Sequence, residues 1–553
     1  MYYKDLVKIY SELGKTTKRL EKVDIISEFI KNVDELNEVI NLLQGKVYAD
    51  WEDLKLGVSE RLILKVINQA TGISQDKIEK LWRTKGDLGK VAEELMKNKP
   101  QRTLVSKKLS LTKVYENLRK LSGLEGEGTV GRKVSLVAEL LSNASSEESR
   151  YIVNTVIGDL RVGVAAGIIR DSIAKAFDKD VKEVEENYNL SVDYGRVAEL
   201  SKKGKLNLDL TPGRPIKLML AIKVENIKDA FKAVGERVQC EYKLDGFRLQ
   251  CHFDGKRVSL FTRRMENVTK QFPEVVSYVK KNVKGKNYIL DCEAAGINEK
   301  GRYLPFQKIS QRIRRKYDIE KMAKEFPVEL NLFDVMFYNG KNLMNKDLIE
   351  RRKILEKIVK EKKGKIILTK KIISDNEKEI KRFYNQALKD GTEGLILKNL
   401  ESNFKPGRYV KGWVKLKPIL EPLDLVITGA VWGEGKRSNW LSSFIVSCRK
   451  DEEYLGIGKV GTGVKEKNEG VTFDELTRLL RKLIIDTKGK HVSVKPKIII
   501  EVAYEEIQES SNYGSGFALR FPRILRLRED KGLIDVDSLE RVKRIYKNQR
   551  GQK

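Results

Sequence analysis

The sequence predicts a multidomain α+β protein, with an all-α N-terminal part, an α+β middle part built on antiparallel sheets, and a small C-terminal β-barrel. Three observations predict this architecture. The chain has 553 residues, too many for one hydrophobic core. Apolar residues follow helical spacing up to about residue 207, and short β-like runs follow. Prolines at 211–215 and at 418–422 mark two breaks. We therefore predict domains at 1–210, 211–418 and 419–553.

The N-terminal part repeats a helical signal. The segments "VDELNEVINLLQG" and "GRKVSLVAELLSNASSEESRYIVNTVIGDL" place apolar residues three and four positions apart. Short breaks that contain Gly or Ser separate such segments, so we expect roughly ten helices.

The middle and last parts carry strand signals. Short β-like runs occur in "VQCEYKLDGFRLQCHFDGKRVSLFTR", "NYILDCEAAGI", "VELNLFDVMFYNG" and "EGLILKN", joined by turns such as Asp254-Gly255. Beyond Pro418 and Pro422, the runs "DLVITGAVW", "SSFIVSCR", "YLGIGKVGTGV" and "KIIIEVAYEEI" predict a barrel of about five strands.

The charge of the chain predicts a polyanionic partner. The net charge is +30, from 109 Lys and Arg against 79 Asp and Glu. Residues 211–418 hold most of the excess, with 48 basic and 26 acidic side chains. Lysines and arginines that contact phosphates release counterions, so a nucleic acid is the expected partner.

Cysteine usage and hydropathy favour an intracellular protein. Four scattered cysteines without a CxxC pair, with only two histidines, argue against a disulfide framework and a structural zinc site. We expect the cysteines to be reduced and mostly buried. No apolar run reaches the length of a bilayer span, and "MYYKDLVKIYSELGKTTKRL" has the pattern of an amphipathic helix. We expect a monomer that is neither secreted nor membrane-bound, cytoplasmic and nucleoid-associated in a prokaryote.

The segment "EYKLDGFR" holds the candidate nucleophile, Lys243. Alternation along the run places Lys243 on one strand face with Glu241 and Asp245, before Gly246, where the chain can turn and approach a ligand closely. A lysine attacks only after its amine loses a proton, which burial or nearby cations favour. The nearby strands offer such cations: Arg248, Arg263, Lys415 and Lys417. By itself "KLDG" fits a surface hairpin equally well.

Seven segments in order resemble the signatures of ATP-dependent DNA ligases of the archaeal/eukaryotic replicative type. They are "EYKLDG" (241–246), "FTRR" (261–264), "DCEA" (291–294), "LNLFDVMF" (330–337), "EGLILK" (393–398), "WVKLK" (413–417) and "LRFPRILRLREDK" (519–531). The helical region, with "GDLRVGVAAG" at 158–167, resembles the ligase DNA-binding domain. The resemblance covers nearly the whole chain and implies a DNA-binding domain, an adenylation (nucleotidyltransferase) domain and a C-terminal OB-fold.

The resemblance also implies a reaction. Lys243 would attack ATP to form a lysyl-AMP phosphoramidate, in the presence of Mg²⁺ or another divalent cation. The AMP would then pass to the 5′-phosphate of nicked duplex DNA, and the adjacent 3′-hydroxyl would displace it and seal the strand. The cellular roles implied are DNA replication, repair and recombination, with cell division.

Site residues carry over from the resemblance position by position. Glu241 would lie at the adenine edge, Phe333 against its face, and Glu293 would accept from the ribose hydroxyls. Asp245 would shape the turn after the lysine. The residues expected to hold phosphates are Arg248, Arg263, Arg408, Lys415 and Lys417. Those expected to orient the pyrophosphate, after domain closure, are Arg520, Arg523, Asp530 and Lys531. Glu393 and Glu293 are the metal candidates. Phe333 could equally be a core aromatic, and the two glutamates could equally be ion-pair partners of lysines.

Other functions share part of this pattern. An RNA ligase or capping guanylyltransferase uses the same lysine chemistry, but the helical N-terminal part and the "RFPR" and "REDK" segments favour a DNA ligase. The absence of a cysteine cluster disfavours an NAD-dependent ligase. A non-catalytic nucleic-acid clamp of the same fold would bind DNA without adenylation. Gln101–Leu104 ("QRTL") resembles a degenerate sliding-clamp-binding motif without the usual aromatic pair, and fits a plain loop equally well.

Overall fold

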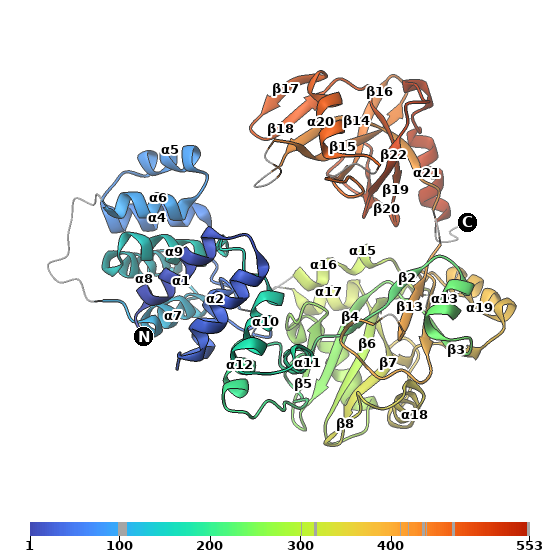
Figure 1. Cartoon of the computed structure of the whole chain (residues 1–553). Coiled ribbons are helices and arrows are strands. Elements are labelled where there is room, and N and C mark those ends of the chain that lie inside the picture. Colours follow the sequence, from blue (N-terminus) through green and yellow to red (C-terminus); the bar gives the residue numbers. More distant parts are fainter. Residues whose placement is uncertain are drawn as a thin grey trace.

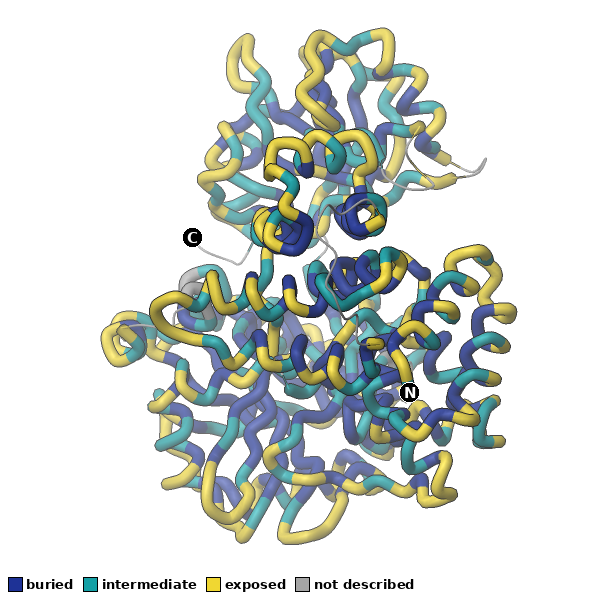
Figure 2. The backbone as a smooth tube through the Cα atoms, turned by 90° about the vertical axis from the view of Figure 1, so that its left-hand side faces the viewer, coloured by how far each residue is buried: buried dark blue, intermediate teal, exposed yellow. Residues whose placement is uncertain are grey.

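The computed structural model describes residues 1–52, 54–97, 108–299, 301–314, 318–409, 411–418, 420–433, 437, 439–466 and 470–549. A helical part, a β-rich part and a second β-rich part follow one another along the chain (Figure 1). In Figure 2 the buried residues line the interior of the upper, C-terminal part and of the body below it.

The described part of residues 1–210 contains twelve α-helices, two more than the rough expectation. Some breaks between helices are very short, such as residues 16–18 between the first two. Apolar periodicity in the sequence cannot tell two helices apart across so short a break. The helices are α1 (Tyr3–Lys15), α2 (Arg19–Lys31), α3 (Leu36–Leu43), α4 (Glu60–Thr71), α5 (Gln75–Lys85), α6 (Leu88–Lys97), α7 (Leu111–Lys120), α8 (Thr129–Asn143), α9 (Ser146–Ile157), α10 (Ala166–Ala176), α11 (Val181–Ser191) and α12 (Tyr194–Lys202).

Local signals begin and end these helices, and their apolar faces share one core. At the start of α4 the Ser59 hydroxyl accepts from the Leu62 amide, and the helix ends at Gly72, in the left-handed region. Helix α9 begins with a capping box of Ser145 and Glu148. Buried side chains from successive helices meet in a single cluster, so packing rather than propensity stabilises the short helices.

The middle part contains two mainly antiparallel sheets. One has the order β10-β3-β11-β13-β2, and the other β5-β4-β6-β7-β8 with β9 beside β7. Its strands are β1 (Met219–Leu220), β2 (Ile222–Val224), β3 (Val238–Tyr242), β4 (Phe247–Phe253), β5 (Val258–Thr262), β6 (Tyr288–Gly296), β7 (Val328–Tyr338), β8 (Lys341–Asn342), β9 (Ile366–Leu368), β10 (Lys371–Ser374), β11 (Leu395–Asn399), β12 (Gly407–Arg408) and β13 (Trp413–Leu416). Its helices are α13 (Ile227–Val234), α14 (Pro273–Asn282), α15 (Phe306–Ile309), α16 (Gln311–Arg314), α17 (Ile319–Glu325), α18 (Leu348–Ile358) and α19 (Glu377–Lys389).

The last part is strand-rich, as predicted, but has more strands than the five expected. Strand β14 pairs with β15 along one edge, and with β19 and then β18 along the other, so the sheet bends around it. The strands are β14 (Leu423–Trp432), β15 (Leu441–Lys450), β16 (Glu453–Val460), β17 (Ile484–Lys488), β18 (His491–Val494), β19 (Ile499–Ala503), β20 (Glu506–Glu509), β21 (Phe517–Arg520) and β22 (Arg523–Leu527), with helices α20 (Phe473–Arg481) and α21 (Leu539–Asn548).

Two further expectations concern the chain as a whole. All four cysteines are buried and free of disulfides, as expected. Within the described ranges, no helix combines the length and apolar character needed to cross a bilayer. Gln101–Leu104 lie outside the described residues, so the clamp-motif hypothesis stays a prediction.

Candidate active site

The site lies between the two sheets of the middle part, and strand register decides which side chains face it. Residues directly opposite each other on antiparallel strands point to the same side. Ile396 on β11 is opposite Glu241 on β3 and Lys415 on β13. Two residues along β11, Lys398 is opposite Gln239 and Trp413. One sheet face therefore carries charged and aromatic side chains in two rows.

The facing sheet contributes Arg248, Glu293 and Phe333. Arg248 on β4 is opposite Glu293 on β6. Phe333 owes its position to a β-bulge, because the register of β6 with β7 passes from Asp334 to Leu332 and leaves Phe333 without a partner. The Phe333 and Trp413 rings, one from each sheet, approach edge to face with centroids 6.1 Å apart.

Lys243 lies just beyond the end of β3, because the strand ends at Tyr242, earlier than the alternating run up to Gly246 predicts. Its amide donates to the Gly394 carbonyl at 2.9 Å, and the Glu393 amide donates to the Lys243 carbonyl at 2.8 Å. Its Nζ lies 2.6 Å from Glu393 Oε2, and the side chains of Lys243 and Glu393 are 22% and 9% exposed. The amine is thus held by a nearly buried carboxylate while it stays accessible.

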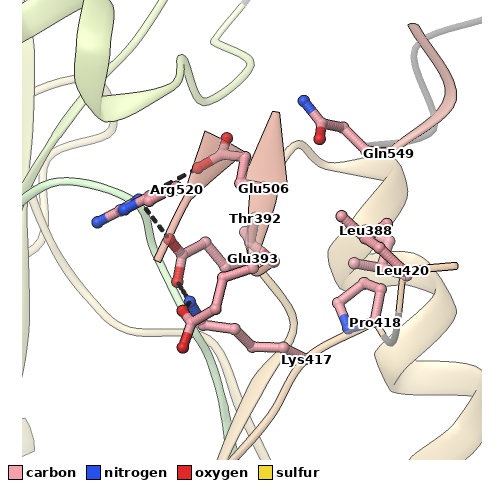
Figure 3. Close-up of a pocket in the computed structure, with 10 residues that line it drawn as sticks. Leu388, Thr392, Glu393, Lys417, Pro418, Leu420, Glu506, Arg520 and Gln549 are labelled. Carbon is pink, nitrogen blue, oxygen red and sulfur yellow. Dashed lines mark hydrogen bonds and ion pairs between the residues drawn. The ribbon is translucent and has the colours of Figure 1, made fainter. Parts of the chain in front are cut away.

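Glu393 gathers further cations. Lys417 Nζ lies 2.9 Å from the same Glu393 oxygen, and the Arg520 guanidinium lies 3.7 Å from the other (Figure 3). Burial alone would raise the pKa of Glu393, but the ammonium groups of Lys243 and Lys417 hold it well below its ordinary value. Burial lowers the pKa of Lys415. Burial also opposes the charge of Lys417, yet Glu393 and Glu505 outweigh it and raise the pKa of that lysine.

The turn after Lys243 is shaped by close backbone approach. A Cβ at Gly246 would lie 2.3 Å from the Ala294 carbonyl oxygen, so only glycine fits here. The Gly246 amide donates to Glu293 Oε1 at 3.1 Å. Asp245 accepts from the Phe306 amide at 2.9 Å, a contact that fits its expected role in shaping the turn. Burial raises the pKa of Glu293 to about 8.

At the other end of the site, a buried ion pair lies beside the rings of Phe333 and Trp413. Lys398 Nζ lies 2.6 Å from Glu241 Oε2, and both side chains are at most 2% exposed. The same ammonium faces the rings of Phe333 and Trp413, at 4.7 and 4.2 Å from their centroids. Phe333 is only partly buried.

Several predicted residues do not converge on Lys243 in this structure. Arg248 donates twice to Asp291, at 3.0 and 2.6 Å, and its guanidinium faces the rings of Phe333 and Trp413. Arg263 is exposed just after β5, and Arg523 is exposed on β22. Two predicted residues form ion pairs inside the last part: Asp530 lies 2.7 Å from Arg528, and Lys531 lies 2.6 Å from Asp424. The side chain of Arg408 lies outside the described part of the chain.

The structure adds residues that sequence reasoning missed. Glu505 lies 3.1 Å from Lys417, and Glu506 lies 3.1 Å from Arg520. Both glutamates come from the last part: Glu506 pairs with Arg520 across neighbouring strands of that part, whereas Glu505 contacts Lys417 of the middle part, which nothing local in "AYEEI" indicates. Lys398, the last residue of "EGLILK", had no predicted role, although a lysine that ends the apolar run "LIL" in a central strand is a signal of a buried charge.

Glu293 and Glu393 fit a hard divalent cation. Both provide carboxylate oxygens at the edge of the cleft, the donors that Mg²⁺ prefers. Among the described residues, no cluster of three or more His, Cys, Asp or Glu side chains could hold a metal alone. The donor set therefore suits an ion that keeps several waters and takes other ligands from substrate phosphates.

Three family models match the chain in order: "DNA ligase N terminus" over residues 2–174, "ATP dependent DNA ligase domain" over 218–417 and "ATP dependent DNA ligase C terminal region" over 437–531. A DNA ligase of Nanoarchaeum equitans is 47% identical, with 100% of this chain and 99% of the relative aligned. One of Thermococcus fumicolans is 40% identical, with 99% and 98% aligned.

A solved structure supports the same architecture. The protein described as "Pmar-Lig_PreS3" superposes with a TM-score of 0.60 at 18% identity, and the match covers 95% of this chain and 99% of that one. At this low identity the likeness shows the fold alone. The family is shown by the sequence relatives, which are at least 40% identical over nearly the full chain. The chain belongs to the family of ATP-dependent DNA ligases.

Proposed function

We propose that this protein seals nicks between a 5′-phosphate and a 3′-hydroxyl in duplex DNA, with Lys243 as the nucleophile. The observation that carries the proposal is the position of Lys243 Nζ, accessible in the cleft and 2.6 Å from the Glu393 carboxylate, beside Lys417. The amine attacks the α-phosphorus of ATP, the bond to the β-phosphate breaks, and pyrophosphate leaves. The AMP then passes to the 5′-phosphate, and the 3′-hydroxyl displaces it.

The other side chains bind and orient. Adenine would lie against Phe333 with its edge toward Glu241, and Glu293 would accept from the ribose. Lys415 and Lys417 would hold phosphates, together with Arg263, Arg408 and, once released from Asp291, Arg248. Glu293 and Glu393 would hold Mg²⁺, which when bound neutralises charge that develops on the phosphates.

The last part has a role in the first step. Arg520 already reaches the site, 3.7 Å from Glu393 and 4.0 Å from Asp245, and we assign it to the pyrophosphate end of ATP. Arg523, Asp530 and Lys531 would join it after further movement of that part. The helical part (1–210) would clamp the DNA, the part 211–418 would adenylate, and the part 419–553 would be the OB-fold. One chain carries the whole site, so we propose a monomer that works inside the cell.

Labelling tests the proposal. The protein is incubated with Mg²⁺ and α-labelled ATP, GTP or NAD⁺, and then chased with nicked DNA or nicked RNA. We expect acid-labile label from ATP alone, and its transfer to nicked DNA. Lys243→Ala should abolish labelling, whereas Lys256→Ala, in an exposed turn, should not change it. Label retained by Lys243→Ala would contradict the assignment, and DNA binding without label would favour the clamp alternative.

A further inference from the structure

Lys398 is a costly residue to bury where it lies. Its side chain is 1% exposed, and burial lowers the pKa of its ammonium group. It sits between two aromatic rings, where an apolar side chain would pack without any desolvation cost. Ile396, two positions earlier on the same face of β11, is apolar. Stability alone therefore gives no reason for a lysine here.

The partner of Lys398 explains the charge. Glu241 is 2% exposed, and Lys398 Nζ contacts its Oε2 at 2.6 Å. Its other oxygen accepts from Gln239 Nε2 at 2.6 Å and lies 3.5 Å from an Arg352 guanidinium nitrogen. A carboxyl buried this deeply remains ionised only if cations compensate it, and Lys398 is its nearest cation.

The ionisation state of Glu241 decides which purine it can read. An ionised carboxylate only accepts hydrogen bonds, so it pairs with the 6-amino group of adenine and repels the 6-keto oxygen of hypoxanthine or guanine. A protonated carboxyl can donate to that keto oxygen. A site built around an acceptor discriminates strongly, because the wrong base leaves buried polar groups unpaired.

We propose that Lys398 is a positioning residue for base selection: by pairing with Glu241 it keeps that carboxylate a hydrogen-bond acceptor, so that the site takes 6-amino rather than 6-keto purine nucleotides. This inference rests on the proposed function, in which Glu241 lies at the base edge. It predicts that selectivity between ATP and ITP, which differ at this edge, depends on a residue that need not touch the base.

The test is nucleotide selectivity in the Lys398→Met variant. Initial rates of self-labelling with ATP and ITP are measured to give kcat/KM for each nucleotide. We expect the ATP-to-ITP ratio to fall about tenfold or more, mainly through KM for ATP. Lys398→Arg should restore most of the selectivity.

A second buried ion pair provides the matched control. Arg312 is 1% exposed and lies 2.7 Å from Glu274, away from the cleft, so Arg312→Met should lower Tm without changing the ratio. If Lys398→Met does not fold, Lys398→Met/Glu241→Gln leaves no unpaired charge and should show a relaxed ratio. A ratio within about twofold of the parent in the folded variant would overturn the inference. Failure of the parent to label from ATP would instead overturn the proposed function.

Discussion

Glu393 is the carboxylate that contacts the proposed nucleophile and the cations beside it. It contacts Lys243 and Lys417 through one oxygen and approaches Arg520 through the other. We predict that Glu393→Gln lowers the rate of self-adenylation by about 10²-fold, because a neutral amide cannot hold the attacking amine in place. Pre-steady-state labelling with ATP measures this rate. Glu401→Gln, exposed just after β11, is the control, and a rate for Glu393→Gln equal to that of the control would contradict the role.

We predict that Glu293 makes the proposed binding of a divalent cation depend on pH. Burial raises its pKa to about 8, so the carboxyl is mostly protonated at neutral pH, and a cation must displace that proton. We expect Mg²⁺ affinity to rise with pH up to about 8, by at most about tenfold per pH unit, with proton release below that pH. Calorimetric titration in two buffers of different ionisation enthalpy measures both.

The same group links pH to stability with a definite sign. Because the folded protein holds the proton of Glu293 more tightly than the unfolded chain, the free energy of unfolding should fall as pH rises toward 8. Glu293→Gln should remove this contribution and flatten the pH dependence of Mg²⁺ binding. Mg²⁺ affinity that varies equally with pH in both proteins would rule out Glu293 as the titrating ligand.

At the scale of the element, the turn that leads from β3 in one sheet to β4 in the other depends on one glycine. An alanine Cβ at Gly246 would overlap the Ala294 carbonyl on β6, so Gly246→Ala should destabilise the protein by about 1–3 kcal/mol. It should also slow self-adenylation, because the amide that binds Glu293 must shift. Gly14→Ala in α1 meets no atom within 4 Å and should stabilise slightly. Denaturant unfolding measures the free energy of unfolding of the two variants. Equal values would contradict the close contact between residue 246 and the Ala294 carbonyl.

Strand pattern explains which parts of the site could be predicted. Alternation in "EYKLDG" and "WVKLK" indicates which side chains share a strand face, such as Lys415 and Lys417, whereas the neighbour relation of Glu241, Ile396 and Lys415 comes from the strand pairing. Phe333 could not be placed by alternation, because a bulge in β7 resets its direction. Arg248 follows the pattern, but its pairing with Asp291 comes from a strand 43 residues away along the chain.

At the scale of the whole molecule, contacts between the parts were the least predictable. Glu505 reaches Lys417, and Arg520 reaches Glu393, only because the C-terminal part lies against the middle part, an arrangement that no local pattern encodes (Figure 3). The composition of each part, in contrast, indicated its fold class well. Helical spacing and strand alternation are local properties of the sequence. The placement of one part against another depends instead on how their folded surfaces fit together.

The charge of the whole chain predicts strong salt dependence for one step only. With a net charge of +30, affinity for nicked DNA should fall by about 10³-fold or more between 50 and 200 mM salt, as counterion release requires. Self-adenylation, which uses contacts inside the cleft, should change much less over that range. Fluorescence anisotropy and labelling at matched salt concentrations measure both. Equal salt dependence of the two would argue against DNA contact spread over the basic surface.

The arrangement of the two β-rich parts predicts competition between Glu505 and ATP. Glu505 Oε2 lies 3.1 Å from Lys417 Nζ, where a phosphate of the nucleotide is expected, so ATP must displace this carboxylate. Burial opposes its charge, but Lys417 holds the pKa of Glu505 below its ordinary value, so the carboxylate is ionised at neutral pH.

The pair of Glu505 and Lys417 is partly exposed, which limits its strength to about 1 kcal/mol. Glu505→Gln should therefore lower KM for ATP in self-adenylation by about two- to fivefold, with kcat nearly unchanged. Glu453→Gln, exposed at the start of β16, should leave KM at the parent value. A raised KM in Glu505→Gln would mean instead that the contact helps to hold the parts together while ATP binds.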